Sequence, residues 1–244
     1  MLQKLCFFLL VLFCFTLTTS AQTVDEIIAK NLQARGGLEK IKAIKSLKQT
    51  GSLIQQGQEL PIILQNKRPS SIRFELTIQG TQIIQAYDGQ TGWAISPFLG
   101  TKDAQKLSDD QLKDVVEQAD LDGALVDYKD KGHKVTLVGK EDLEGSSVYK
   151  LKVDKKDGDT NYISIDAENY LEIKSSQKRK LPNGQEIEIE TLISDYKSVE
   201  GVLFPHAIEN KVPGQGSFQI KISKIEVNSQ IDDNIFKMPA STSK

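Results

Sequence analysis

Apolar and polar residues alternate one by one along most of the chain. In one segment Ile72, Phe74 and Leu76 alternate with Arg73 and Glu75. Because successive side chains of a strand point to opposite faces, such a segment has one dry and one wet face, which is typical of antiparallel sheets. The pattern predicts about twelve strands, at residues 46–56, 59–67, 71–79, 81–87, 91–96, 133–139, 147–154, 160–166, 169–179, 185–194, 202–210 and 217–228.

Two capping boxes predict where helices begin. Thr23 stands three residues before Glu26, and Ser108 stands three residues before Gln111. At this spacing the two side chains satisfy backbone N–H groups that the first turn of a helix leaves unpaired. Helical periodicity then predicts one helix up to the glycines at 36–37 and a short second helix after them. The apolar face of the third helix consists of Leu112, Val115, Val116 and Ala119.

The boundaries between strands carry turn and bulge signals. In the last strand the apolar phase jumps from Ile222 to Ile225, which predicts a β-bulge near Ser223–Lys224. Residues 97–130 form the one long insertion without strands, and within it residues 100–107 are predicted as loop or irregular helix. Pairs that tolerate positive φ predict tight hairpins at Asp88–Gly89, Asp157–Gly158 and Asn183–Gly184.

The number of strands limits the shape of the molecule. Twelve strands about 4.8 Å apart make a sheet nearly 60 Å wide, and three short helices roughly 10 Å across cannot cover it if it is flat. The predicted fold is therefore mainly β with α: a strongly curved antiparallel sheet of about 11–12 strands, an open half-barrel with helices plugging its concave face. Such a hollow favours an apolar cavity for a small molecule, and a fully packed core is the alternative.

The N-terminus has the pattern of a secretory signal peptide. Lys4 precedes an apolar run from Leu5 to Leu17, and Thr19–Ser20–Ala21 supplies small residues for cleavage near Ala21. A membrane anchor is the alternative, but the run is shorter than the roughly 20 residues that a span needs. We therefore expect residues 1–21 to be a signal peptide, residues 22–244 to form a single domain, and the protein to be periplasmic.

Both cysteines of the chain lie inside this predicted signal peptide. A lipid-attachment signal at Cys14 would want a small residue before it, but Phe13 is bulky. Without Cys6 and Cys14, the exported chain has no disulfide and no thiolate metal site.

Charge and motif content exclude several classes of function. The formal net charge of −2 lacks the basic excess of nucleic-acid-binding proteins. His133 and His206 are far apart in sequence and have no zinc-ligand spacing. No nucleophile elbow, phosphate-binding loop or dinucleotide fingerprint is present. We therefore predict no catalytic residue, no metal and no cofactor, and a protein that is not an enzyme.

Three motifs then suggest a family. They are Lys67–Arg68–Pro69 at the start of a strand, Asp88–Gly89–Gln90–Thr91–Gly92–Trp93 followed by Pro97–Phe98, and Ile235–Phe236–Lys237–Met238–Pro239 near the C-terminus. Together with the segment 132–166, they resemble the LolA-like superfamily of bacterial lipoprotein carriers and outer-membrane lipoprotein-sorting proteins. The resemblance covers nearly the whole exported chain, and the order of elements agrees with it.

The resemblance implies a fold and a function. Members of this superfamily form an unclosed β-barrel with a helical lid over an apolar cavity, and they hold the acyl chains of lipoproteins in transit through the periplasm. Arg68 matches the arginine that bonds the lid and holds it shut; an ordinary arginine at a strand edge is the alternative. The expected function is a periplasmic carrier for lipoprotein acyl chains or lipids, with membrane-bound donor and acceptor proteins as further partners. An envelope sensor or scaffold that binds a protein partner is the alternative.

The apolar strand and helix positions supply the candidate ligand-binding residues. Ordinary core packing is the alternative for each of them. The expected cavity wall and lid consist of Ile72, Phe74, Leu76, Ile84, Trp93, Tyr149, Leu151, Ile187, Ile189, Phe218 and Ile220, with Leu112, Val115 and Val116 on the lid.

Overall fold

One curved antiparallel sheet dominates the computed structural model, which describes residues 22–180, 186–214 and 216–240. Its thirteen strands do not close into a barrel, which confirms the predicted open half-barrel. The strands are β1 (Ser46–Gln55), β2 (Gln58–Lys67), β3 (Ser71–Ile78), β4 (Thr81–Tyr87), β5 (Gly92–Ser96), β6 (Thr101–Lys106), β7 (Lys134–Leu143), β8 (Ser146–Asp154), β9 (Thr160–Asp166), β10 (Glu172–Lys180), β11 (Glu186–Val199), β12 (Val202–Val212) and β13 (Gly216–Val227).

The helices are few and short, as the sequence predicts. Both capping boxes are present: Thr23 caps α1 with Glu26, and Ser108 caps α3 with Gln111. The helices are α1 (Val24–Ala34), α2 (Leu38–Ala43) and α3 (Asp109–Ala119), with 3-10 turns η1 (Pro97–Leu99) and η2 (Asp233–Ile235).

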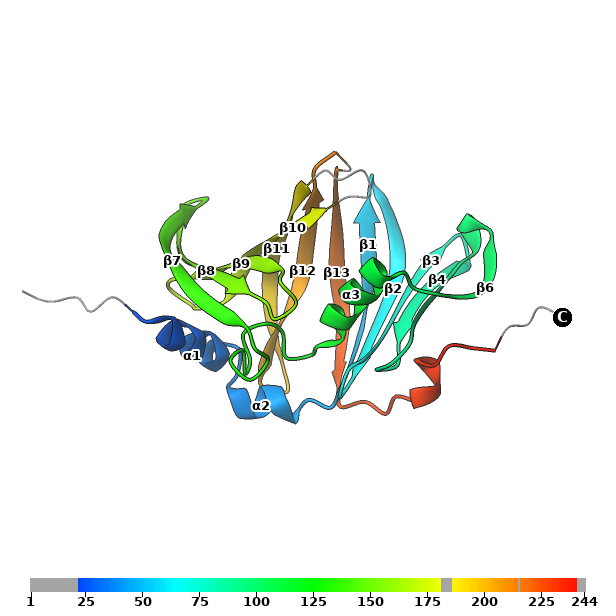
Figure 1. Ribbon diagram of the computed structural model, residues 1–244, viewed down its shortest axis with the longest axis horizontal. Helices are drawn as coiled ribbons and strands as arrows, with labels where there is room; N and C mark the ends of the chain where they lie inside the picture. The colour runs from blue at the N-terminus through cyan, green and yellow to red at the C-terminus, as the bar shows by residue number, and fades with distance from the viewer. Residues whose placement is uncertain (1–21, 181–185, 215, 241–244) are drawn as a thin grey trace, which may run out of the picture.

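The strand order explains why α3 crosses the sheet. The order is β6-β5-β4-β3-β2-β1-β13-β12-β11-β10-β9-β8-β7, so β6 and β7 lie at opposite edges although they follow one another in sequence. The chain between them must therefore traverse the whole width of the sheet. Figure 1 shows α3 on this path, in front of the middle strands, with β7 to β9 at the left and β3 to β6 at the right.

The predicted bulge in the last strand is present. Thr50 of β1 pairs with Lys224, but the next residue, Gly51, pairs with Ile222, so Ser223 is the extra residue. The Ser223 hydroxyl donates a hydrogen bond to the Thr50 carbonyl oxygen, at 3.0 Å. A bulge increases local twist and bend, and this one lies between β1 and β13, in the middle of the sheet.

The alternation of apolar and polar residues did not predict one strand. Residues 101–106 were expected to be loop or irregular helix, but they form β6, which pairs with β5 at one edge of the sheet. Their sequence, Thr-Lys-Asp-Ala-Gln-Lys, has no alternation of apolar and polar residues. An edge strand is held by backbone hydrogen bonds to one neighbour and needs no apolar face, so periodicity could not reveal it.

Three apolar clusters form the core, each beneath a different helix. Ile41 of α2 packs with Ile62, Val126 and Phe204 over the middle of the sheet. α1 packs on β8 and β9, and α3 packs on β3. The helices thus cover the concave face in separate places and leave residues between them half-buried.

Two sequence predictions fall outside the described residues. They are the signal peptide at 1–21 and the hairpin turn at Asn183–Gly184. Within the described part of the chain, no helix is both long enough and apolar enough to cross a membrane.

Candidate functional site

The cross-strand register assigns most of the predicted cavity residues to one face of the sheet. We call the face that carries Ile72, against which α3 packs, the inner face, and the other the outer face. Residues paired across neighbouring strands share a face. Following the pairs from β3 to β8 places nine predicted residues on the inner face: Ile72, Phe74, Leu76, Tyr149, Leu151, Ile187, Ile189, Phe218 and Ile220.

Two predicted wall residues lie on the outer face instead. Ile84 pairs with Glu75, and Trp93 pairs with Ala86, which pairs with Arg73. Arg73 and Glu75 alternate with the inner-face residues of β3, so the placement of Ile84 and Trp93 on the concave wall was wrong.

Trp93 is buried by the C-terminal segment. The Trp93 side chain is 2% exposed, and its Nε1–H donates to the carbonyl oxygen of Phe236 at 2.7 Å. The Arg73 guanidinium lies 5.7 Å from the Trp93 ring centroid and donates to the carbonyl oxygen of Ile235 at 2.9 Å. The tryptophan therefore anchors the end of the chain to the outer face of the sheet.

Part of the inner face is filled by the protein itself. Tyr149 and Leu151 are buried against Ile27 and Ile28 of α1. Ile72 is buried beneath Val115 of α3. Ile187 is also buried. The remaining inner-face candidates, Phe74, Leu76, Ile189, Phe218 and Ile220, are half-buried.

Arg68 joins two segments that cover the inner face. Its guanidinium makes a two-pronged ion pair with Asp122, just after α3, with N–O distances of 2.7 and 2.6 Å. Its Nε–H donates to the carbonyl oxygen of Ile44 at 2.6 Å, and it also reaches the carbonyl oxygen of Ile41, at 3.3 Å. The hydrogen bond from Arg68 lowers the pKa of Asp122. Arg68 thus fastens the end of the α3 segment to the end of α2, and its role as a latch stays a prediction.

The opposite flank of α3 is held by ion pairs to the other half of the sheet. Lys113 pairs with Asp159 at 2.7 Å, and Asp114 pairs with Arg179 of β10 at 2.6 Å. Glu117 pairs with Lys155, whose side chain is only 6% exposed. Burial raises the pKa of Asp114, and Arg179 opposes this effect. α3 therefore spans the hollow, with apolar contacts to β3 on one side and charged contacts to the β8–β9 turn and β10 on the other.

A cavity of about 890 Å³ opens along this charged flank of α3. Leu112, Val116 and Ala124 supply its apolar lining, and charged residues from α3 and from the β8–β9 turn surround them. Val116 is 41% exposed, which is unusual for a large apolar side chain in the middle of a helix. The volume is within the usual range of about 300–1,000 Å³ for small-molecule pockets.

This cavity differs in part from the predicted one. Leu112 and Val116 line it as expected, whereas Val115 points to the packed side of α3. The nine inner-face candidates are absent from its described lining. What the sequence missed is the opposite wall, formed by residues 123–133 and the β8–β9 turn, because no pattern in those loops links them to α3. That any of these residues binds a ligand stays a prediction.

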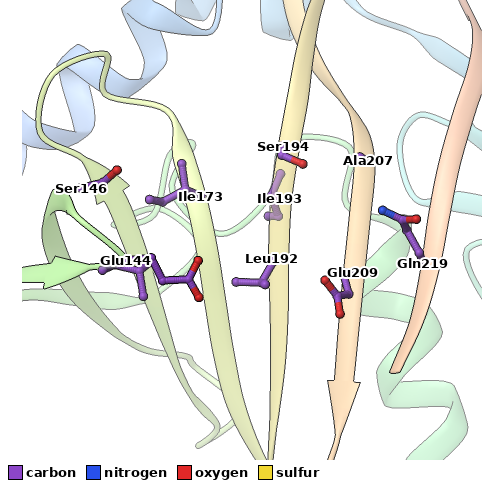
Figure 2. Close-up of a pocket in the computed structure, with 10 residues that line it drawn as sticks. Glu144, Ser146, Ile173, Leu192, Ile193, Ser194, Ala207, Glu209 and Gln219 are labelled. Carbon is purple, nitrogen blue, oxygen red and sulfur yellow. The ribbon is translucent and has the colours of Figure 1, made fainter. Parts of the chain in front are cut away.

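A second, smaller pocket lies on the outer face. Figure 2 shows it between the β7–β8 hairpin, with Glu144 and Ser146, and strands β10 to β13. Its volume is about 360 Å³, and its lining mixes Leu192 and Ala207 with Glu209 and Gln219. A lining that mixes apolar and charged side chains in this way is typical of a solvated sheet surface. In the described part of the chain, no three His, Cys, Asp or Glu side chains are placed to hold a metal ion.

Comparison with known proteins places the fold in a recognisable class. Neither the protein-family models nor the curated protein sequences contain a match to this chain. Among solved structures, a LolA superfamily protein from Nitrosomonas europaea matches with a TM-score of 0.59 at 13% identity, over 89% of this chain and 98% of the other. A DUF1329 family protein from Desulfovibrio piger gives 0.59 at 12% identity, over 89% and 98%.

A third solved structure comes from Vibrio parahaemolyticus and carries the description of an outer-membrane lipoprotein-sorting protein domain. It matches with a TM-score of 0.54 at 12% identity, over 86% of this chain and 97% of the other. The fold of the present chain is therefore LolA-like, as the sequence motifs suggest.

Proposed function

We propose that this protein is an exported, non-catalytic binding or carrier protein for acylated ligands in the periplasm, and that it holds them in the cavity between α3, residues 123–133 and the β8–β9 turn. The observation that carries the proposal is the position of α3, which spans the hollow and borders an apolar cavity of about 890 Å³. Burial of an acyl chain gains about 0.8 kcal/mol per CH₂ group, so a cavity of this size can hold a chain firmly. The LolA-like fold supports the same reading.

Release requires that the cover can move. The contacts of α3 to the two halves of the sheet differ in kind: buried apolar side chains on β3 and partly exposed ion pairs on the other flank. Exposed ion pairs contribute about 0–1 kcal/mol each and weaken with salt. The charged flank is therefore the side that opens. The apolar contact of α3 with β3 acts as the hinge, and Arg68 acts as the latch.

The direct test is to identify any lipid that copurifies with the protein. Protein purified from its native envelope and then denatured should release lipid that mass spectrometry detects, and the empty protein should take up a fluorescent fatty acid. Protein that arrives empty, binds no fatty acid and pulls down one stable protein partner would contradict the proposal and favour a sensor or scaffold.

Replacement of Arg68 by leucine should weaken the latch. We expect the free energy of unfolding to fall by about 2–3 kcal/mol, because Asp122 and two backbone carbonyl groups lose their partner. A bound fatty acid should also dissociate about tenfold faster, which corresponds to about 1.4 kcal/mol. Urea unfolding and stopped-flow displacement of a fluorescent fatty acid measure the two effects.

Arg73→Leu is the matched control for this variant. Arg73 also holds a carboxylate, Glu75, and a backbone carbonyl, but on the outer face. It should lose comparable stability and leave the dissociation rate unchanged. Equal acceleration in both variants would mean that Arg68 acts through stability alone and is no latch.

A further inference from the structure

Most charged side chains around the α3 cavity have a partner of opposite charge, but Lys156, at one end, has none among the residues that the structure describes. Lys113 pairs with Asp157 and Asp159, Lys155 with Glu117, and Lys131 with Asp120. These three lysines and four acids are therefore paired with one another across the cavity wall, and Lys113 is shared by two of the acids.

His133 and Lys156, at one end of the cavity, offer hydrogen-bond donors that no other residue in the described part of the chain uses. Nδ1 of His133 accepts a hydrogen bond from the backbone N–H of Lys156, at 3.3 Å. A neutral imidazole that accepts at Nδ1 carries its proton on Nε2, so that nitrogen is a donor. No described residue pairs with the ammonium group of Lys156, which is exposed and also lines the cavity. Burial lowers the pKa of His133, the charges of Lys131 and Lys155 lower it further, and the charges of Asp157 and Asp120 oppose this effect.

Asp157 and Asp120 lie near this end, but each is paired, with Lys113 and Lys131 respectively. The remaining acid of the lining, Asp109, is far from it. Asp109 stands in the first turn of α3, eight residues before Glu117, which places them about 12 Å apart along the helix axis. Lys155, the partner of Glu117, is next to Lys156 in sequence. The end of the cavity at His133 and Lys156 thus presents donors and positive charge, while the apolar lining begins at Val116 and Leu112.

We propose that the α3 cavity binds a single-chain amphiphile with an anionic head group, whose carboxylate or phosphate lies against Lys156 and Nε2–H of His133 and whose hydrocarbon chain lies along Val116 and Leu112. This inference rests on the proposed function and narrows its ligand class. A lipoprotein's esterified or amide-linked acyl chains carry no such charge at the chain end, so the ligand selected here is a free acid or a lysophospholipid.

The test compares head groups on one chain. The purified full-length mature protein is titrated with four probes of identical fluorescent chain that end in a carboxylate, a phosphate monoester, a hydroxyl or a trimethylammonium group. The two anionic probes should bind about tenfold more tightly than the other two, since charge-assisted hydrogen bonds are stronger than neutral ones. Preference for the phosphate monoester over the carboxylate would indicate a lysophospholipid of the lysophosphatidic acid type, and the reverse a fatty acid.

Variants locate the head-group site. His133→Ala with Lys156→Gln should abolish the preference among the four probes and keep the binding of the hydroxyl probe. Lys134→Gln, a neighbouring exposed lysine on β7 that does not line the cavity, should change nothing. Val116→Trp fills the cavity from an exposed position and should weaken the binding of all four probes.

The outcomes separate the two levels of the proposal. Equal affinity for all four head groups in the wild-type protein would overturn this inference and leave the proposed carrier function standing. Binding of no probe at all would overturn both. Anion preference that survives the double variant, or probe binding that Val116→Trp leaves intact, would place the ligand elsewhere and overturn this inference alone.

Discussion

Replacement of Gly51 by alanine should lower the free energy of unfolding by about 3 kcal/mol or more. A Cβ atom at Gly51 would lie 2.0 Å from the carbonyl oxygen of Lys221 and 2.9 Å from Cα of Ile222. Both atoms belong to the backbone of β13, so relief of the clash requires the strands to separate at the bulge. Far-UV circular dichroism during urea unfolding measures the loss.

Gly92→Ala is the matched control for Gly51→Ala. Gly92 also lies in a strand, and neither glycine has a positive φ. A Cβ atom at Gly92 would meet the ends of the Leu112 and Leu107 side chains, at 2.8 and 2.9 Å, which can rotate away. This variant should lose only about 1 kcal/mol. A loss in Gly51→Ala no larger than in Gly92→Ala would show that β1 and β13 do not approach as closely as described.

Gly51→Ala should also reduce ligand binding. The bulge lies between β3, on which α3 packs, and the β8–β9 turn, which forms part of the opposite wall of the cavity, so a sheet that opens there moves the two apart. We expect weaker binding of a fluorescent fatty acid at temperatures at which the variant is still folded, whereas Gly92→Ala, which presses on α3 itself, should mainly alter the rate of exchange.

Replacement of Trp93 by alanine should cost about 3–5 kcal/mol of stability, the usual range for a large buried aromatic side chain. The variant loses the packing of a 2% exposed ring and leaves the carbonyl oxygen of Phe236 without its donor. Because Trp93 is the only tryptophan in the chain, unfolding must again be followed by circular dichroism. The C-terminal segment from Ile231 to Pro239 should at the same time become open to proteases.

The Trp93→Phe variant separates the contribution of ring packing from that of the hydrogen bond to Phe236. Phenylalanine keeps much of the apolar contact and loses the hydrogen bond, so we expect a loss of about 1–2 kcal/mol. Because Trp93 lies on the outer face, fatty-acid affinity should be unchanged in this variant. A large loss of fatty-acid affinity with unchanged stability would show that Trp93 contacts the ligand, which contradicts its placement on the outer face.

The sequence predicted the strands well because alternation is a local property. β1 to β5 and β7 to β13 were foreseen with ends that differ by up to five residues, and the bulge at Ser223 followed from one break in the apolar phase. The two helix starts were foreseen for the same reason, because a capping box joins residues only three apart. β6 was missed because its partner, not its own pattern, makes it a strand.

The site was predicted less well because it depends on distant residues. The position of Ile84 could not be decided from two adjacent isoleucines, which offer one apolar residue to each face. Trp93 was assigned to the hollow because nothing near it in sequence shows that residues 231–239 cover the other face. The charged wall of the α3 cavity comes from a loop and a turn that only the fold brings to α3.

By itself, then, the sequence determined the half-barrel: alternating strands in this number must form a wide sheet, and a wide sheet with little helix must curve. The tertiary structure alone decided which face each apolar residue occupies and where the hollow remains open. The reason is physical. Curvature follows from the local twist and pleat of each strand, whereas a cavity is the space left between segments that lie far apart in the chain, and its position depends on how all of them pack together.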